Sequence, residues 1–309
     1  MLVVRGIDWA ELVAGLRAAR SGELGAAFAL VSLSFFVRGL RWGILLSAQR
    51  TVAPGTLFWA TATGYLGNYS LPARAGEFIR SLALAQKTAI NASYVLATAL
   101  TERIFDALTL VIISAAALST LSDVPETLVI ATRTMAVVGL VGVLGVLIAP
   151  RLEPLVEWVL DRLRLPAHLH SRLHSVAAQF LLGMHACQHT RRALGFAALT
   201  ALVWSVDAVM AVMGGQALGL PLTLAESLVL LAMLGLSSAI PSTPGYIGVF
   251  QFVAVVVLTR YDYSREEALA YILTYQAISY LAALLYGLIG IWQLNARQFL
   301  SGRRRAGGD

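Results

Sequence analysis

Two short stretches decide the fold that this sequence predicts: Pro72-Ala-Arg-Ala-Gly76 and Pro241-Ser-Thr-Pro-Gly245. Each has the pattern P-x-x-x-G and interrupts an otherwise apolar segment. The apolar halves around the breaks are residues 55–70 and 76–85 for the first, and residues 222–240 and 245–258 for the second. Inside a bilayer, backbone that leaves a helix must be covered by protein or face a water-filled cavity. The pattern therefore predicts two re-entrant or broken helical hairpins.

The composition is that of a membrane protein. Of the 309 residues, 58% are hydrophobic and 13% are charged, whereas a soluble domain carries about 25% charged residues. The deficit runs along the whole chain, which excludes a soluble protein with a single anchor. A helix needs roughly 20 apolar residues to cross a bilayer, and the longer apolar runs are residues 24–46, 92–119, 131–149, 193–218 and 268–292. We predict an all-α polytopic membrane helix bundle in which residues 1–309 form a single transmembrane domain.

The matched breaks also indicate an internal repeat. We place the first repeat at about residues 24–120 and the second at about 193–295, joined by a span and an amphipathic segment at about 130–192. Chance placement of Pro and Gly in apolar sequence is the alternative.

The distribution of basic residues predicts the orientation. Cytoplasmic loops are enriched in Lys and Arg, and the count favours a multi-pass protein of the plasma membrane with a cytoplasmic C-terminus. In this count the cytoplasmic side holds Arg38, Arg41 and Arg50, and the amphipathic segment 150–192 lies on the cytoplasmic membrane surface. The two hairpins then enter from opposite sides, so the repeats are inverted, as in many transporters.

Three charged residues, Glu102, Arg103 and Asp106, fall in the middle of span 92–119. A charge at the bilayer centre costs about 2.5–3.5 kcal/mol on insertion scales, so all three need partners. Glu102 and Asp106 share a helix face at i,i+4, and Arg103 reaches Asp106 at i,i+3. One Arg against two carboxylates leaves a net charge of −1, so we expect a further cation, from Arg74 or Arg80. The cluster is either a headgroup or ion pathway, or a polar group that only fixes helix packing.

Arg74, Glu77 and Arg80 recur every third residue just after the first break. On a short helix they form one charged face. This face is either an ion-pair ladder at the membrane surface, which adds little stability, or the wall of a cavity in which Arg side chains bind a phosphate.

The second half offers fewer charges. Asp207 stands alone in the middle of span 193–218, where it is either part of a pathway or hydrogen-bonded to a neighbouring helix. Ser242, Thr243 and Gly245 supply hydroxyls, freed carbonyls and a new helix N-terminus after Gly245, which favours an anion. A simple kinked loop is the alternative.

The sequence predicts no metal, no cofactor and no nucleic-acid partner. No carboxylate or Cys accompanies the five His residues at a zinc-binding spacing; they are His168, His170, His174, His185 and His189. The sequence contains no G-x-S-x-G, P-loop, Rossmann or H-E-x-x-H motif. We therefore predict no catalytic residue and expect the protein not to be an enzyme.

Three ordered stretches resemble a known family. Leu71-Pro-Ala-Arg-Ala-Gly-Glu-Phe-Ile-Arg80, Thr101-Glu-Arg-Ile-Phe-Asp106 and Ile240-Pro-Ser-Thr-Pro-Gly-Tyr-Ile-Gly-Val-Phe250 are similar to the flippase-like transmembrane region of lysylphosphatidylglycerol synthases. The resemblance implies inverted repeats, re-entrant helices and lipid translocation. It implies a stand-alone member without the soluble aminoacyl-transfer domain, so synthase activity is not expected.

The chain departs from this family at three positions. Gln251 stands where the family usually has Glu, Tyr246 where it often has a second Gly, and Gln276 where Arg is common. The second half has therefore lost charges that the first half keeps, and Gln251 and Gln276 join the candidate site.

The predicted function is translocation of a phospholipid or other phosphate-bearing lipid between leaflets, flippase- or scramblase-like, through a polar intramembrane cleft. The partner is then a membrane lipid. The alternative is a non-transporting membrane partner or scaffold of a cell-envelope lipid- or glycan-modifying enzyme. A second copy of the chain, in a homo-oligomer, is a further partner to test.

Overall fold

The computed structural model describes residues 8–71, 75–118, 126–162, 166–184, 189–238 and 243–305. Over these residues the regular structure is entirely helical, which confirms the all-α prediction. The α-helices are α1 (Trp9–Arg17), α2 (Ser21–Leu46), α3 (Pro54–Ser70), α4 (Gly76–Thr88), α5 (Ala92–Leu118), α6 (Glu126–Ile148), α7 (Glu153–Arg162), α8 (Ala167–Met184), α9 (Thr190–Ala217), α10 (Leu224–Ser237), α11 (Val249–Leu258) and α12 (Arg265–Arg305). Three 3-10 turns join them: η3 (Ala149–Leu152), η5 (Pro244–Tyr246) and η6 (Thr259–Tyr261).

The chain is a membrane protein with several spanning segments. Within the described residues, four segments are long and apolar enough to cross a bilayer: Ser21–Leu46, Thr190–Ala217, Pro244–Tyr261 and Arg265–Leu294. Helix α5 has 27 residues, also above the roughly 20 that a span requires, but it carries the charged cluster in its interior.

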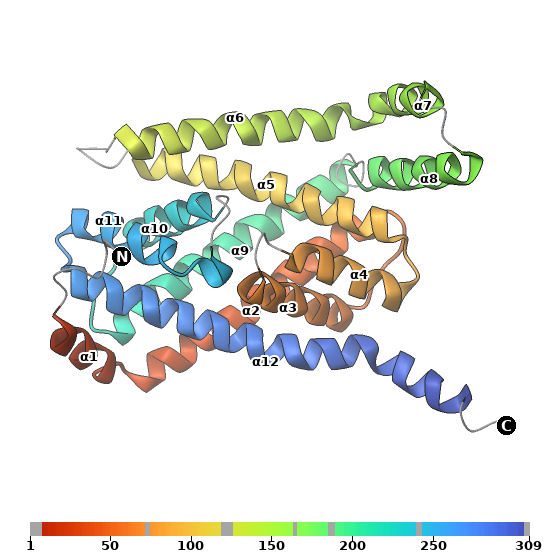
Figure 1. Cartoon of the computed structure of the whole chain (residues 1–309). Helices are drawn as coiled ribbons and strands as arrows, with labels where there is room; N and C mark the ends of the chain where they lie inside the picture. The colour runs from red at the N-terminus through yellow and green to blue at the C-terminus, as the bar shows by residue number, and fades with distance from the viewer. Residues whose placement is uncertain are drawn as a thin grey trace.

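Two helical hairpins lie between the long helices α5 and α12 (Figure 1). Helices α3 and α4 form one hairpin towards the right end of the bundle, and α10 and α11 form the other towards the left end. The broken ends of both hairpins are turned towards the middle, where α3 contacts η5 and the rings of Tyr69 and Tyr280 pack with centroids 4.5 Å apart. Residues 72–74 and 239–242 of the two breaks lie outside the described residues.

The first break is fixed by close packing at Gly76. A Cβ atom on Gly76 would lie 1.9 Å from the carbonyl oxygen of Gly64 and 2.6 Å from Oδ1 of Asn68. The same Asn68 Oδ1 accepts a hydrogen bond from the Gly76 amide at 3.1 Å. Only glycine lets the start of α4 approach α3 this closely.

The second break is fixed by backbone conformation. Gly245, Tyr246 and Gly248 all have positive φ angles, of 67°, 59° and 90°. This left-handed region ends a right-handed helix and is uncommon for a residue other than glycine. Helix α11 consequently begins at Val249, and the predicted helix start directly after Gly245 is wrong.

Each hairpin has its own apolar core. One core joins α2, α3, α4 and α5 around the buried side chains of Trp42, Leu57, Leu84 and Tyr94. The other joins α10, α11 and α12 and includes Leu12 of α1. A third core joins α2, α3, α9 and α12, so the two hairpins are packed into one bundle.

The segment expected on the membrane surface divides into two parts. In α7 the apolar side chains Leu155 and Trp158 are exposed, as an interfacial helix requires. Helix α8 instead packs on α5, where a Cβ on Gly183 would lie 2.6 Å from Cβ of Ala97. The surface position stays a prediction for α7, whereas α8 is part of the helix bundle.

Candidate functional site

Arg41 is the centre of the charged cluster. Its side chain is 0% exposed and reaches two carboxylates of α5: Nη2 donates to Oε1 of Glu102 at 2.7 Å, and Nη1 donates to Oδ1 of Asp106 at 2.6 Å. Further bonds run from Nε to Glu102 at 3.1 Å and from Nη2 to Asp106 at 3.0 Å. Arg41, which the sequence counted on the cytoplasmic side, is carried by α2 into the interior of the bundle.

Arg80 supplies the second cation that the sequence required. Its Nη2 lies 2.7 Å from Oε2 of Glu102 and 2.5 Å from Oε2 of Glu77, and its guanidinium stacks 4.5 Å from the Trp42 ring centroid. Both Arg80 and Glu77 are buried, so for these two residues a solvated surface ladder is excluded. Arg74, the third member of the predicted ladder, lies outside the described residues.

Arg103 is the most accessible member of the cluster. Its Nε lies 3.0 Å from Oε1 of Glu77, its Nη1 lies 3.1 Å from Oδ2 of Asp106, and its side chain is 25% exposed. The cluster thus has three guanidiniums, of Arg41, Arg80 and Arg103, and three carboxylates. The three α5 residues alone carry a net charge of −1, and the addition of Arg41, Arg80 and Glu77 brings the cluster to zero within the described residues.

Asp207 of α9 is bonded to the neighbouring helix α2, as one of the alternatives from the sequence predicted. It forms a short ion pair with Arg38 of α2 and accepts a hydrogen bond from Oγ of Ser34 at 2.6 Å. The Arg38 guanidinium also lies 5.8 Å from the Tyr65 ring centroid and 6.0 Å from that of Trp204. This second ion pair joins α2 to α9 and places the Arg38 side chain inside the bundle.

Neutral amides hold the second break. Gln276 of α12 donates to the Gly245 carbonyl at 3.1 Å, and its Oε1 accepts from Nε2 of Gln251. The Gln251 Oε1 accepts from the Gly248 amide at 2.6 Å, and the Tyr280 hydroxyl donates to the Gly245 carbonyl. The structure therefore brings together the predicted residues Gly245, Gln251 and Gln276 as a support for the break.

The predicted hydroxyls of the second break take no part in this network as far as the structure describes them. Thr243 is exposed and donates to the Ile247 carbonyl at 2.6 Å, which closes the turn. Ser242 lies outside the described residues.

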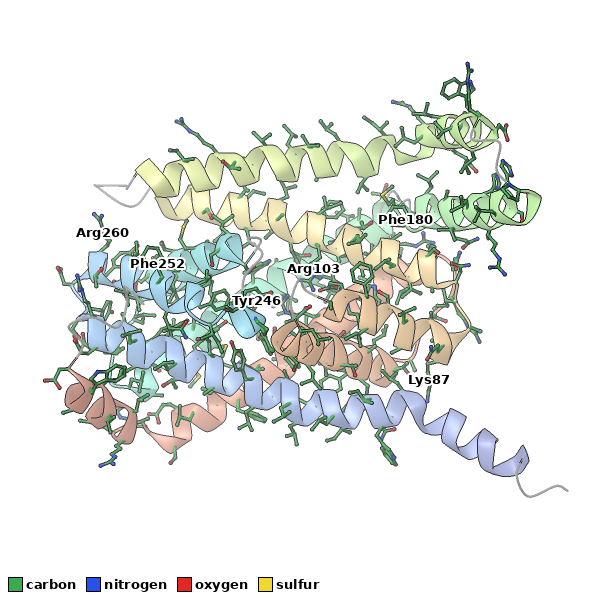
Figure 2. The ribbon with its side chains drawn as sticks, viewed as in Figure 1. Lys87, Arg103, Phe180, Tyr246, Phe252 and Arg260 are labelled. Atoms are coloured by element: carbon green, nitrogen blue, oxygen red, sulfur yellow. The ribbon has the colours of Figure 1, made fainter. Side chains whose placement is uncertain are left out.

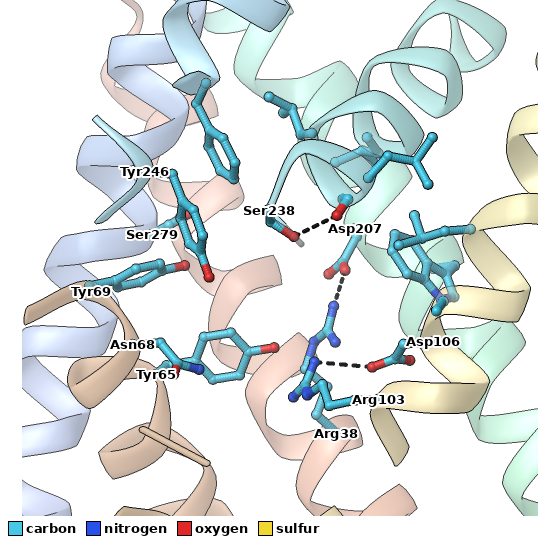
Figure 3. Close-up of a pocket in the computed structure, with 18 of the residues that line it drawn as sticks. Arg38, Tyr65, Asn68, Tyr69, Arg103, Asp106, Asp207, Ser238, Tyr246 and Ser279 are labelled. Atoms are coloured by element: carbon cyan, nitrogen blue, oxygen red, sulfur yellow. Dashed lines mark hydrogen bonds and ion pairs between the residues drawn. The ribbon is translucent and has the colours of Figure 1, made fainter. Parts of the chain in front are cut away.

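A cavity of about 300 Å³ lies where the two breaks meet the charged groups. Figure 3 shows the hydroxyls of Tyr65, Tyr69 and Tyr246 turned towards its interior, opposite the guanidiniums of Arg38 and Arg103. The lining residues come from eight α-helices, from η5 and from the residue after α10; they are Arg38, Tyr65, Asn68, Tyr69, Glu77, Arg103, Asp106, Ala107, Leu110, Trp204, Asp207, Leu231, Leu234, Gly235, Leu236, Ser238, Tyr246, Phe250, Tyr275 and Ser279. A smaller cavity of about 60 Å³ adjoins it and shares the Arg38–Asp207 pair. Figure 2 shows Arg103 and Tyr246 between the two ends of the bundle, which Lys87 and Arg260 mark.

The predicted residues divide by their position relative to this cavity. Four line it: Glu77, Arg103, Asp106 and Asp207. Arg80 and Glu102 are buried behind these residues. Arg38, Tyr65 and Tyr275 line the cavity but were not among the residues that the sequence predicted. The signal available for Arg38 was its position inside the apolar run 24–46. Within the part of the chain that the structure describes, no group of three or more His, Cys, Asp or Glu side chains could hold a metal ion.

Comparison with known proteins identifies the family of the chain. The family model of the lysylphosphatidylglycerol synthase TM region matches residues 1–287. The chain belongs to this family. The resemblance noted from the breaks and the charged span is thereby confirmed, and the lysylphosphatidylglycerol synthase TM region covers both hairpins and the whole cavity.

One relative of this family member carries an enzyme name. The chain is 28% identical over 284 residues to "Glycosyltransferase AglD" of Haloferax volcanii, a match that covers 82% of this chain and 45% of the relative. The chain therefore spans less than half the length of that protein. No solved structure matches the chain.

Proposed function

We propose that this protein moves a phosphate-bearing lipid between the two leaflets of the plasma membrane. The observation that carries the proposal is the cavity between the two breaks, with two guanidiniums on its wall in a bundle of apolar helices. Intramembrane ionisable residues are costly and mark substrate or ion pathways.

The proposed membrane arrangement has two re-entrant hairpins that open to opposite sides. Supporting this, α3 and α4 lie towards one end of the bundle and α10 and α11 towards the other, with their broken ends turned inward (Figure 1). The two hairpins then belong to inverted repeats at about residues 24–120 and 193–295. The C-terminus is cytoplasmic in this arrangement.

The residues have separate proposed roles. Arg103, the accessible cation of the cluster, contacts the phosphate, while Arg41 and Arg80 hold the carboxylates behind it. The Gly245, Gln251 and Gln276 network keeps the second break open beside the cavity. The acyl chains stay in the bilayer, and the sequence contains no nucleotide-binding motif, so movement is passive or ion-coupled.

Reconstitution tests the proposal. Purified protein in liposomes with a fluorescent phospholipid in both leaflets is treated with a membrane-impermeant quencher, and quenching beyond the outer-leaflet half measures translocation. We expect translocation by the wild type and by Arg260→Gln, an exposed control far from the cavity, but a loss of at least about tenfold in Arg103→Gln. Well-folded wild-type protein that moves no phosphate-bearing lipid contradicts the proposal.

A second candidate function is a membrane-embedded partner of a lipid- or glycan-modifying enzyme of the cell envelope. The name of the Haloferax volcanii relative, of which the chain matches less than half, favours it. In that case one such enzyme co-purifies in stoichiometric amount, and Arg103→Gln leaves the activity of that enzyme unchanged. The same purification reports whether the chain forms a homo-oligomer.

A further inference from the structure

The wall of the cavity combines paired charges with hydroxyl groups. The carboxylates of Glu77, Asp106 and Asp207 all have guanidinium partners. Between these pairs stand the hydroxyls of four tyrosines and of Ser238 and Ser279, and Figure 3 shows those of Tyr65, Tyr69 and Tyr246 directed inward. A ligand bound in this cavity would therefore contact carboxylates and guanidiniums that are already paired with each other, together with neutral hydroxyl groups.

A strongly charged ligand group is a poor match for the deep part of the cavity. Arg38 and Asp207 are paired, with side chains only 12% and 13% exposed. An ammonium or a second phosphate would have to displace one partner, and a buried charge that loses its partner is strongly destabilising. At Arg103, by contrast, the exposed quarter of the side chain lets a phosphate approach while the existing pairs remain.

A hydroxyl fits beside a closed ion pair because it both donates and accepts. The Asp207 carboxylate accepts from Arg38 and from Ser34, which uses two of its roughly four lone-pair sites. A ligand hydroxyl therefore has room to donate to the carboxylate without displacing Arg38. A ligand group with several hydroxyls can also form hydrogen bonds with the tyrosine and serine hydroxyls of the cavity wall.

A ligand ring that carries several hydroxyls also has apolar C–H faces, and aromatic side chains of the cavity can contact these faces. Tyr65, Tyr275 and Trp204 line the cavity, and Tyr65 is held by stacking on Phe35 at 4.6 Å between ring centroids. Binding sites of this kind pair aromatic walls with a few placed polar groups. A cavity of about 300 Å³ is at the lower end of small-molecule sites, so it holds a headgroup and excludes the acyl chains.

We infer that the part of the headgroup beyond the phosphate is an uncharged polyhydroxyl ring, of the glycosyl class, bound against the Arg38–Asp207 pair and the tyrosines. This inference rests on the proposed lipid translocation for its setting, and it names the substrate class of the same cavity.

The test compares lipids that share acyl chains and phosphate and differ only beyond the phosphate: phosphatidylglucose, phosphatidylethanolamine and phosphatidylmethanol. Translocation is measured in liposomes, and equilibrium binding is measured separately with dihexanoyl forms of the three lipids on protein in detergent. We expect phosphatidylglucose to move faster and bind tighter than both others by about fivefold or more, the equivalent of one or two hydrogen bonds.

A pair of variants locates the effect. Tyr65→Phe removes one cavity hydroxyl and keeps the ring that stacks on Phe35, so it should weaken phosphatidylglucose binding by about fivefold and leave phosphatidylmethanol binding unchanged. Tyr286→Phe is the matched control, because its hydroxyl bonds to Ser32 at 3.0 Å, away from the cavity, and it should change neither.

The outcomes separate the two ideas. If all three lipids move and bind alike, or phosphatidylethanolamine is preferred, the glycosyl inference is wrong and translocation stands. If none moves but phosphatidylglucose binds preferentially through Tyr65, the inference stands and translocation is wrong. If none moves and binding shows no preference, both are wrong.

Discussion

Arg41 and Arg103 belong to one ion cluster, but the structure predicts opposite consequences for their removal. Arg41 is fully buried and makes four bonds of 2.6–3.1 Å to Glu102 and Asp106. Truncating one partner of a buried ionic group costs about 3–5 kcal/mol. For a chain of this size, 1 kcal/mol shifts the unfolding temperature by about 2 °C, so Arg41→Gln should lower it by about 6–10 °C.

Removal of Arg103 should cost much less stability. Its two carboxylate partners keep other guanidiniums, Glu77 with Arg80 at 2.5 Å and Asp106 with Arg41 at 2.6 Å, and water reaches its partly exposed side chain. We expect a loss of about 1.5 kcal/mol, the lower end for one hydrogen bond to a charged group because the side chain is partly exposed, and a fall in the unfolding temperature of about 3 °C. Lipid movement should nevertheless be lost, because Arg103 is the cation of the cluster on the cavity wall.

The assay combines thermal unfolding in detergent, size-exclusion chromatography and liposome translocation for both variants. The double variant Arg41→Gln with Asp106→Asn removes one charge of each sign and should regain part of the stability lost by Arg41→Gln alone. The reasoning is refuted if Arg41→Gln unfolds within about 2 °C of wild type, or if Arg103→Gln is the less stable of the two.

Three further predictions follow from other parts of the bundle. Gly76→Ala should abolish detergent-stable protein, judged by size-exclusion chromatography, because its Cβ would lie 1.9 Å from the Gly64 carbonyl; Gly55→Ala, with nothing within 4 Å, is the control, and equal yields would contradict the packing argument. Asp207→Asn keeps the acceptor for Ser34 but leaves Arg38 without its carboxylate, so translocation should fall about tenfold while Ser205→Ala, on the exposed side of α9, has no effect; an unchanged rate would remove the second ion pair from the pathway. Cysteines at Ala75 and Thr243, on a Cys187→Ser background, should react with impermeant thiol reagents from opposite membrane faces, and labelling of both from one face would end the inverted-repeat proposal.

The sequence predicted the helical bundle and the α5 charges because these are local properties. Apolar runs mark the spans, and Glu102, Arg103 and Asp106 stand out since each is costly in a bilayer. The prediction of a further cation also followed from the local count of one Arg against two carboxylates, and Arg80 is such a cation.

The ion-pair and hydrogen-bond partners that lie on different helices could not be predicted from the sequence. Arg41 lies 61 residues before Glu102, and Arg38 lies 169 residues before Asp207, so no spacing rule joins them. Both Arg residues occur near the end of an apolar run, where a long cation usually extends to the membrane surface. The Gln251–Gln276 contact spans 25 residues and two helices, and it depends on how η5 turns, which the positive φ of Tyr246 determines.

The buried positive and negative charges are equal in number, and this determines how the membrane potential should affect lipid movement. Four guanidiniums, of Arg38, Arg41, Arg80 and Arg103, face four carboxylates in the described part of the bundle, so a movement that carries these groups together transfers no net charge. In passive movement, any voltage dependence then reports the charge of the transported lipid. One elementary charge crossing 100 mV changes in free energy by about 2.3 kcal/mol, or roughly fiftyfold in the ratio between leaflets. A lipid with a single phosphate charge should therefore accumulate on the electrically positive side, whereas a zwitterionic one should distribute evenly.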